Sequence, residues 1–183
     1  YALLRKSRIL LEKRRRVEVL SWIQELRRRV AALAGKSARM EARLELAVIF
    51  YKLNHFAESL RLFEKTIQEN PGSAFWHPEI HLYQGYNLYQ LGQTRAGREH
   101  LLRFYNCFPE SPRSHLVLAQ IGDAFREEGR PELAMRFYKL TAKRFPQSEG
   151  AFIARLRQTE LLQRPFAAAK GGEPLGDRYQ KLI

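Results

Sequence analysis

The chain has 183 residues, of which 45% are hydrophobic and 28% are charged, and its net charge at pH 7 is +13. This balance is typical of a folded protein and excludes an intrinsically disordered chain, and no apolar run reaches the roughly 20 residues that a transmembrane helix needs. The single cysteine, Cys107, excludes an internal disulfide and zinc sites built on paired cysteines, and its place beside a Phe-Pro pair favours a buried thiol.

Positive charge is concentrated at the start of the chain. Residues 1–43 hold 13 Lys or Arg against 4 Glu, whereas the other 140 residues hold 19 basic and 15 acidic groups. We expect residues 1–38 to form a basic helical hairpin that caps or continues the repeats that follow. We interpret its arginine runs as a solvated face, with an acidic protein, a lipid surface or nucleic acid as alternative partners. Because the sequence begins at Tyr1 without a signal-like segment, we expect it to be a fragment whose targeting segment lies elsewhere.

The next segment, residues 39–75, has apolar residues at helical spacing in two runs. This periodicity predicts two helices that form a hairpin. Asn54 separates the runs, and asparagine adopts the left-handed backbone conformation that a tight turn needs. Pro71 follows the second run, where a helix cannot easily continue.

Two further hairpins are predicted over residues 76–112 and 113–149. Their turns are marked by Gly92 and Gly129. Each hairpin ends in a Phe-Pro-x-Ser sequence, and proline pushes the residue before it out of the helical conformation. A similar ending at intervals of 38 and 37 residues indicates a repeat architecture.

A glycine also recurs inside the first helix of each of these hairpins, at positions 85 and 122. Glycine in a helix interior costs about 1 kcal/mol relative to alanine, so its recurrence needs a packing reason. We expect two helices to approach each other closely at Gly85 and at Gly122.

The C-terminal part is predicted to contain one more helix and a tail. Residues 150–164 are apolar at helical spacing and are followed by Pro165, which we expect to end the helix. Residues 165–183 are rich in glycine and proline, which is typical of a linker.

The order of small residue, aromatic, turn glycine, alanine, aromatic and terminal proline resembles the tetratricopeptide repeat. The third hairpin carries this order at Gly122, Phe125, Gly129, Ala134, Tyr138 and Pro146. The resemblance covers roughly residues 40–148. It implies an all-α fold, a right-handed α-solenoid of tetratricopeptide-like helical hairpins.

The resemblance also implies where a partner binds. In this family the first helix of each repeat lines a concave groove, and partners lie along it as peptides or helices. The corresponding positions here are Leu44, Val48, Tyr51, Leu82, Tyr86, Tyr89, Ala119, Asp123 and Arg126. Core packing is the alternative role for the tyrosines. The lysine and asparagine clamp that grips chaperone C-termini in some members is absent, which argues against partners of that kind.

No sequence pattern indicates catalysis or a cofactor. The chain lacks a phosphate-binding loop, a nucleophile elbow and a dinucleotide fingerprint. His77 and His81 are four residues apart, as a metal pair on a helix requires, but Pro78 predicts that the helix begins between them. We therefore expect surface or helix-capping histidines, no metal site and no enzyme activity.

The sequence thus predicts a protein-interaction scaffold. The Phe-Pro-x-Ser endings look like those of bacterial cell-envelope members, such as outer-membrane-assembly lipoproteins and Tol-Pal-associated coordinators. That likeness favours the bacterial periplasm or cell envelope, with the cytoplasm as the alternative. A second hypothesis is a helical repeat protein that meets nucleic acid or an anionic surface through its basic N-terminal hairpin, although nothing near the arginine runs offers the glycine-flanked, exposed aromatics of a single-strand platform.

Overall fold

The computed structural model describes residues 35–169 and six positions of the preceding segment: Ile23, Glu25, Arg28, Val30, Ala32 and Leu33. Side chains are described as far as Gln163. Most of the predicted N-terminal hairpin and most of the predicted tail therefore lie outside the described residues. The chain divides into two compact units, Tyr1–Phe108 and Pro109–Ile183, and each is considered by itself.

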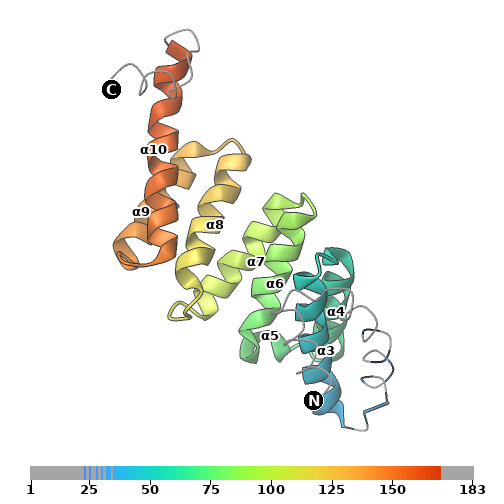
Figure 1. The fold of residues 1–183 in the computed structure, drawn as a ribbon. Helices are drawn as coiled ribbons and strands as arrows, with labels where there is room; N and C mark the ends of the chain where they lie inside the picture. Colours follow the sequence, from blue (N-terminus) through green and yellow to red (C-terminus); the bar gives the residue numbers. More distant parts are fainter. Residues whose placement is uncertain are drawn as a thin grey trace. The chain divides into compact units, whose positions relative to one another are not determined.

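Among the described residues, all regular secondary structure is helical (Figure 1). The helices of the first unit are α3 (Lys36–Lys52), α4 (Phe56–Glu69), α5 (Ser73–Trp76), α6 (Pro78–Gln90) and α7 (Thr94–Cys107). The helices of the second unit are α8 (Ser114–Glu127), α9 (Pro131–Arg144) and α10 (Glu149–Ala169).

The helices pair as the hairpins that the sequence predicts. In the first unit α3 packs against α4 and α6 against α7, and in the second unit α8 packs against α9. The turn residues have positive φ angles of 65° at Asn54, 76° at Gly92 and 73° at Gly129. These three predicted turns are confirmed, because only glycine and a few polar residues adopt this conformation at low cost.

Close contact between α6 and α7 explains the glycine inside α6. A Cβ atom added at Gly85 would lie 2.6 Å from Leu101 Cδ2, and one added at Gly97 would lie 2.8 Å from the carbonyl oxygen of Gly85. The two glycines thus remove the side chains that would hold the helices apart. The expected close approach at Gly85 is confirmed, and the facing Gly97 contributes equally to it.

The Phe-Pro-x-Ser sequence that follows α9 ends one helix and begins the next. Helix α9 ends at Arg144, one residue before Phe145. The Ser148 hydroxyl donates a hydrogen bond to the carbonyl oxygen of Phe145 over 2.8 Å and accepts one from the backbone N–H of Ala151 over 3.1 Å. Since the first N–H groups of a helix lack intrahelical partners, this serine acts as the N-cap of α10.

The corresponding serine after α7 has a different place. Helix α7 ends at Cys107, before Phe108-Pro109, as predicted. Ser111 lies in the connection, however, and α8 begins only at Ser114, because this connection is longer than the one that precedes α10.

Two features of the helices differ from the sequence prediction. Helix α10 continues to Ala169, five residues beyond its expected end at residue 164, and Pro165 lies within it. A proline removes one intrahelical hydrogen bond but does not by itself end a helix. The short helix α5 was not predicted, and its Phe75 and Trp76 side chains are 70% and 83% exposed.

Cys107 is exposed, so the expectation of a buried thiol is wrong. The buried stripe of α7 passes from Leu101 to Phe104 and continues to Phe108, whose ring centroid lies 5.8 Å from that of Phe104. Phe108 follows Phe104 by four residues and so lies on the same side of the helix. It continues the buried stripe, and Cys107 points away from it.

Candidate functional site

Three tyrosines from α3 and α6 form an aromatic group in the first unit, which we call the tyrosine cluster: Tyr51, Tyr83 and Tyr86. The Tyr51 ring centroid lies 5.0 Å from that of Tyr83 and 6.0 Å from that of Tyr86, and the latter two are 6.2 Å apart. Tyr83 is buried and stacks on Phe63, with the ring planes 6° apart. Aromatic pairs of this kind contribute about 0.5–1.5 kcal/mol each beyond burial, so the rings are held in place before any partner arrives.

Burial divides the predicted groove residues of the first unit into two sets. Leu44 and Leu82 are each only 3% exposed, so they are core residues and offer almost no surface to a partner. The resemblance to the tetratricopeptide repeat placed them on the groove side, but their side chains are buried in the core instead. The half-buried members, which retain surface, are Val48, Tyr51, Tyr86 and Tyr89.

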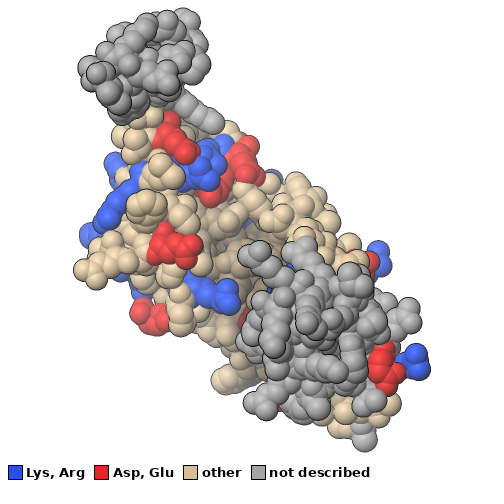
Figure 2. Space-filling view, in the orientation of Figure 1, with Lys and Arg blue, Asp and Glu red and all other residues tan. Residues whose placement is uncertain are grey.

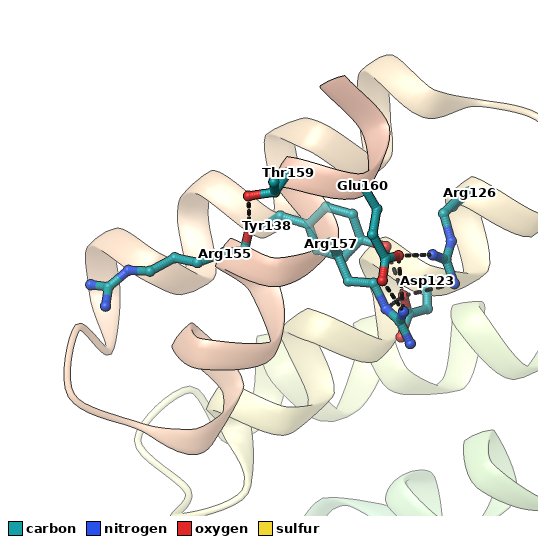
Figure 3. A network of polar contacts seen from close by, with 7 residues as sticks. All are labelled: Asp123, Arg126, Tyr138, Arg155, Arg157, Thr159 and Glu160. Carbon is teal, nitrogen blue, oxygen red and sulfur yellow. Dashed lines mark hydrogen bonds and ion pairs between the residues drawn. The ribbon is translucent and has the colours of Figure 1, made fainter. Parts of the chain in front are cut away.

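In the second unit, five side chains from three helices form a charged network (Figure 3). Asp123 and Arg126 come from α8, Tyr138 from α9, and Arg157 and Glu160 from α10. The Tyr138 hydroxyl donates to Asp123 Oδ1 over 2.7 Å, and Arg157 Nε lies 3.2 Å from the same oxygen without hydrogen-bond alignment. Arg126 and Arg157 both donate to Glu160, over 3.1 and 3.0 Å.

The network is electrically balanced, because two arginines face two carboxylates. Burial, together with the hydrogen bond to Asp123, raises the pKa of Tyr138 above its ordinary value. The hydroxyl therefore stays protonated and donates throughout the physiological pH range. Such a network mainly fixes the positions of α8, α9 and α10, and its charges are already matched before a partner binds.

Loss of the Tyr138 hydroxyl tests whether the network stabilises the second unit. Tyr138→Phe keeps the buried ring and removes only the donor, leaving Asp123 with its arginine partners. We expect a loss of about 1.5–3 kcal/mol, the usual contribution of a hydrogen bond to a charged group. Urea unfolding measures it, and the same substitution in an Asp123→Ala background should cost much less. Equal costs in both backgrounds would show that the hydroxyl and the carboxylate are not coupled.

The sequence prediction found part of this network and missed the rest. Asp123 and Arg126 were predicted as groove residues, whereas Arg157, Glu160 and the role of Tyr138 were not. The missing signal is a complementary charge spacing: Asp123 and Arg126 are three residues apart on α8, and Arg157 and Glu160 repeat this spacing on α10 with the opposite order of charges. Ala119, the other predicted residue of α8, is buried.

The structure does not bring together His77 and His81, the two histidines whose spacing in the sequence would suit a metal pair on a helix. His77 is the residue before α6, and its Nδ1 lies 3.3 Å from Glu79 Oε1, as suits a histidine at a helix start. His81 instead lies against His100 of α7. Burial lowers the pKa of both His81 and His100, the latter to about 4. Both rings are therefore neutral at pH 7.

A pocket of about 560 Å³ lies between α3 and α4. Its lining includes four basic and two acidic side chains: Arg39, Arg43, Arg61, Lys65, Glu58 and Glu69. Arg43 donates to Glu69 over 2.8 Å, and this contact lowers the pKa of the Glu69 carboxyl. Across the described surface in the space-filling view, basic and acidic side chains are interspersed (Figure 2).

Two kinds of arrangement are absent from the part of the chain that the structure describes. No group of three or more His, Cys, Asp or Glu side chains has a geometry that would hold a metal ion. None of the helices in this part combines the length and the apolar character that membrane crossing requires.

Comparison with known proteins identifies related repeats and folds. The family model for the tetratricopeptide repeat matches residues 41–73 and 117–148. No curated protein matches the chain by sequence. Similar solved structures include a Podosopora anserina putative kinesin light chain with nearly identical TPR-like repeats, which is 12% identical with a TM-score of 0.72 over 88% of this chain and 84% of that one. MamA is 14% identical, with a TM-score of 0.60 over 88% of this chain and 97% of that one.

At these identities the likeness to solved structures concerns the fold alone. The two matched segments cover most of the first hairpin and most of the third. The all-α fold of tetratricopeptide-like hairpins that the sequence predicts is therefore confirmed, and the two matched segments are similar to the tetratricopeptide repeat.

Proposed function

We propose that this protein is a non-catalytic interaction scaffold that binds a segment of a partner protein on the first helices of its repeats. Tetratricopeptide repeats generally serve as protein-interaction scaffolds. The observation that carries the proposal here is the tyrosine cluster, because Tyr51 and Tyr86 come from the first helices of two successive hairpins and are only half-buried.

The chemistry of these tyrosines suits a protein partner. A tyrosine offers a large apolar ring and a hydroxyl, and it loses little conformational freedom on binding. Stacking within the cluster has already reduced that freedom in the unbound protein, so less entropy is lost when a partner binds. Tyr89 lies three residues after Tyr86 on α6 and extends the same helical face.

Replacement of the half-buried Tyr86 and Tyr89 tests the proposal. Once affinity capture with the full-length protein has identified a partner, Tyr86→Ala with Tyr89→Ala should weaken its binding at least tenfold, which corresponds to about 1.4 kcal/mol. The circular-dichroism spectrum should stay unchanged. Tyr105→Ala is the matched control, because Tyr105 is also half-buried in the first unit but belongs to a second helix, α7.

Two outcomes would contradict the proposal. Unfolding of the double variant would mean that the tyrosines are structural, and unchanged partner affinity would mean that the contact surface lies elsewhere. The predicted groove residues Asp123 and Arg126 of the second unit stay predictions of this proposal, separate from the test on the first unit.

A place in a bacterial envelope assembly is the finer part of this proposal and rests on the Phe-Pro-x-Ser endings. The alternative, binding to nucleic acid or an anionic surface, rests on the arginine runs of the N-terminal segment, most of which lies outside the described residues. An affinity that falls steeply with salt would favour that alternative, since such binding releases counterions.

A further inference from the structure

Two imidazole rings face each other across α6 and α7 in the first unit. The Nδ1 atoms of His81 and His100 are 3.4 Å apart, and the ring centroids are 5.6 Å apart. Both side chains are half-buried. Neither ring makes another hydrogen bond or ion pair with a described residue.

The separation of the two nitrogens is longer than a good hydrogen bond, which spans about 2.7–3.2 Å. It does match the spacing of two ligands on one tetrahedral ion. Zinc binds histidine nitrogen at about 2.0–2.1 Å, so two nitrogens at a tetrahedral angle are about 3.3–3.4 Å apart.

The helices that carry the two histidines are held firmly. His81 lies one turn before Gly85, and His100 lies three residues after Gly97, the two glycines through which α6 and α7 touch. Because a side chain larger than hydrogen would separate the helices there, the backbone positions of both histidines are fixed. A site built on rigid helices needs little rearrangement to take an ion.

The charges nearby moderate the expected affinity. Arg103, which acts electrostatically on both rings, opposes a cation, while Glu99 beside His100 favours one. Arg103 is exposed, so its charge is screened by solvent. With two protein ligands instead of four, the ion would be exchangeable and would not be required for folding.

We propose that His81 and His100 form a zinc site in which their Nδ1 atoms are the protein ligands and water completes the tetrahedron. The site is separate from the tyrosine cluster and does not depend on the proposed scaffold function.

Zinc titration of the full chain, prepared without a polyhistidine tag, tests this site. Calorimetry should show one bound ion, and His81→Gln or His100→Gln should each weaken binding at least tenfold. His55→Gln is the control, since His55 is half-buried before α4, away from the pair, and should bind zinc as the unmodified chain does. The proposal would be overturned if both single variants bound zinc as the unmodified chain does. It would also be overturned if the unmodified chain bound no zinc at millimolar concentration.

Spectroscopy keeps the test decisive even if a variant fails to fold. In the unmodified chain, zinc should shift the ¹⁵N resonances of His81 and His100 at Nδ1, and Co²⁺ should give the intense visible absorption of a tetrahedral ion. Shifts confined to other histidines, or the weak spectrum of octahedral cobalt, would contradict the proposed site.

Discussion

Gly150→Ala is expected to destabilise the second unit by about 3 kcal/mol or more, the upper part of the usual cost of overpacking. A Cβ atom at this position would lie 2.2 Å from the carbonyl oxygen of His115 and 2.5 Å from its carbonyl carbon. Backbone atoms cannot swing aside as a side chain can, so α10 would have to move away from α8. That movement would also break the hydrogen bond of 3.1 Å from the Gly150 N–H to His115 Nδ1.

Thermal or urea unfolding of the full chain measures this effect, and two other glycines supply controls. At Gly72 an added Cβ meets nothing within 4 Å, so Gly72→Ala should change stability by less than about 0.5 kcal/mol. Gly129 is also open but has a φ of +73°, so Gly129→Ala should cost about 1–2 kcal/mol for the left-handed backbone alone. A Gly150→Ala variant as stable as Gly72→Ala would show that α10 does not pack on His115 as described.

Gly122→Leu is expected to destabilise the second unit by about 1–3 kcal/mol or more, because it overpacks the contact between α8 and α9. A Cβ atom at Gly122 would lie 2.4 Å from Cε1 of Tyr138 and 2.7 Å from its Cδ1. Tyr138 is fully buried and its hydroxyl is bonded to Asp123 over 2.7 Å, so the ring cannot turn away without disrupting the charged network.

Compensating substitutions on the two sides of this contact test overpacking directly, because alanine and leucine favour a helix more than glycine does and helix propensity therefore cannot account for a loss of stability. Gly122→Ala should be strongly destabilising in the natural chain. In a Tyr138→Leu background it should cost much less, because that substitution removes the ring atoms that the new Cβ would meet. The coupling between the two sites is the measured quantity, since contacting residues are not additive. An unchanged melting temperature for Gly122→Leu would refute the contact.

Local features of the fold were predictable because they depend on residues close together in the chain. Asn54, Gly92 and Gly129 have the turn conformation that their residue types favour, and α7 and α9 end just before Phe-Pro. The exception at Pro165 shows the limit of such rules, since α10 continues through it.

The contacts between helices were decided only by the tertiary structure. Helical spacing placed Leu44 and Leu82 beside Tyr51 and Tyr86 on one face, yet packing buried the leucines and left the tyrosines partly exposed. Periodicity predicts the direction in which a side chain points from its own helix. Whether that side chain is buried depends on the side chains of the neighbouring helix and on how closely the two helices pack.

The sequence by itself determined the paired helices of the hairpins, their turns and the repeat, because backbone preference and hydrophobic spacing act over a few residues. Only the tertiary structure decided that Asp123 meets Arg157, that Gly150 rests on His115, and that His81 faces His100. Each of these pairs joins residues 19 to 35 positions apart on different helices, where the packing of whole helical faces sets the contact.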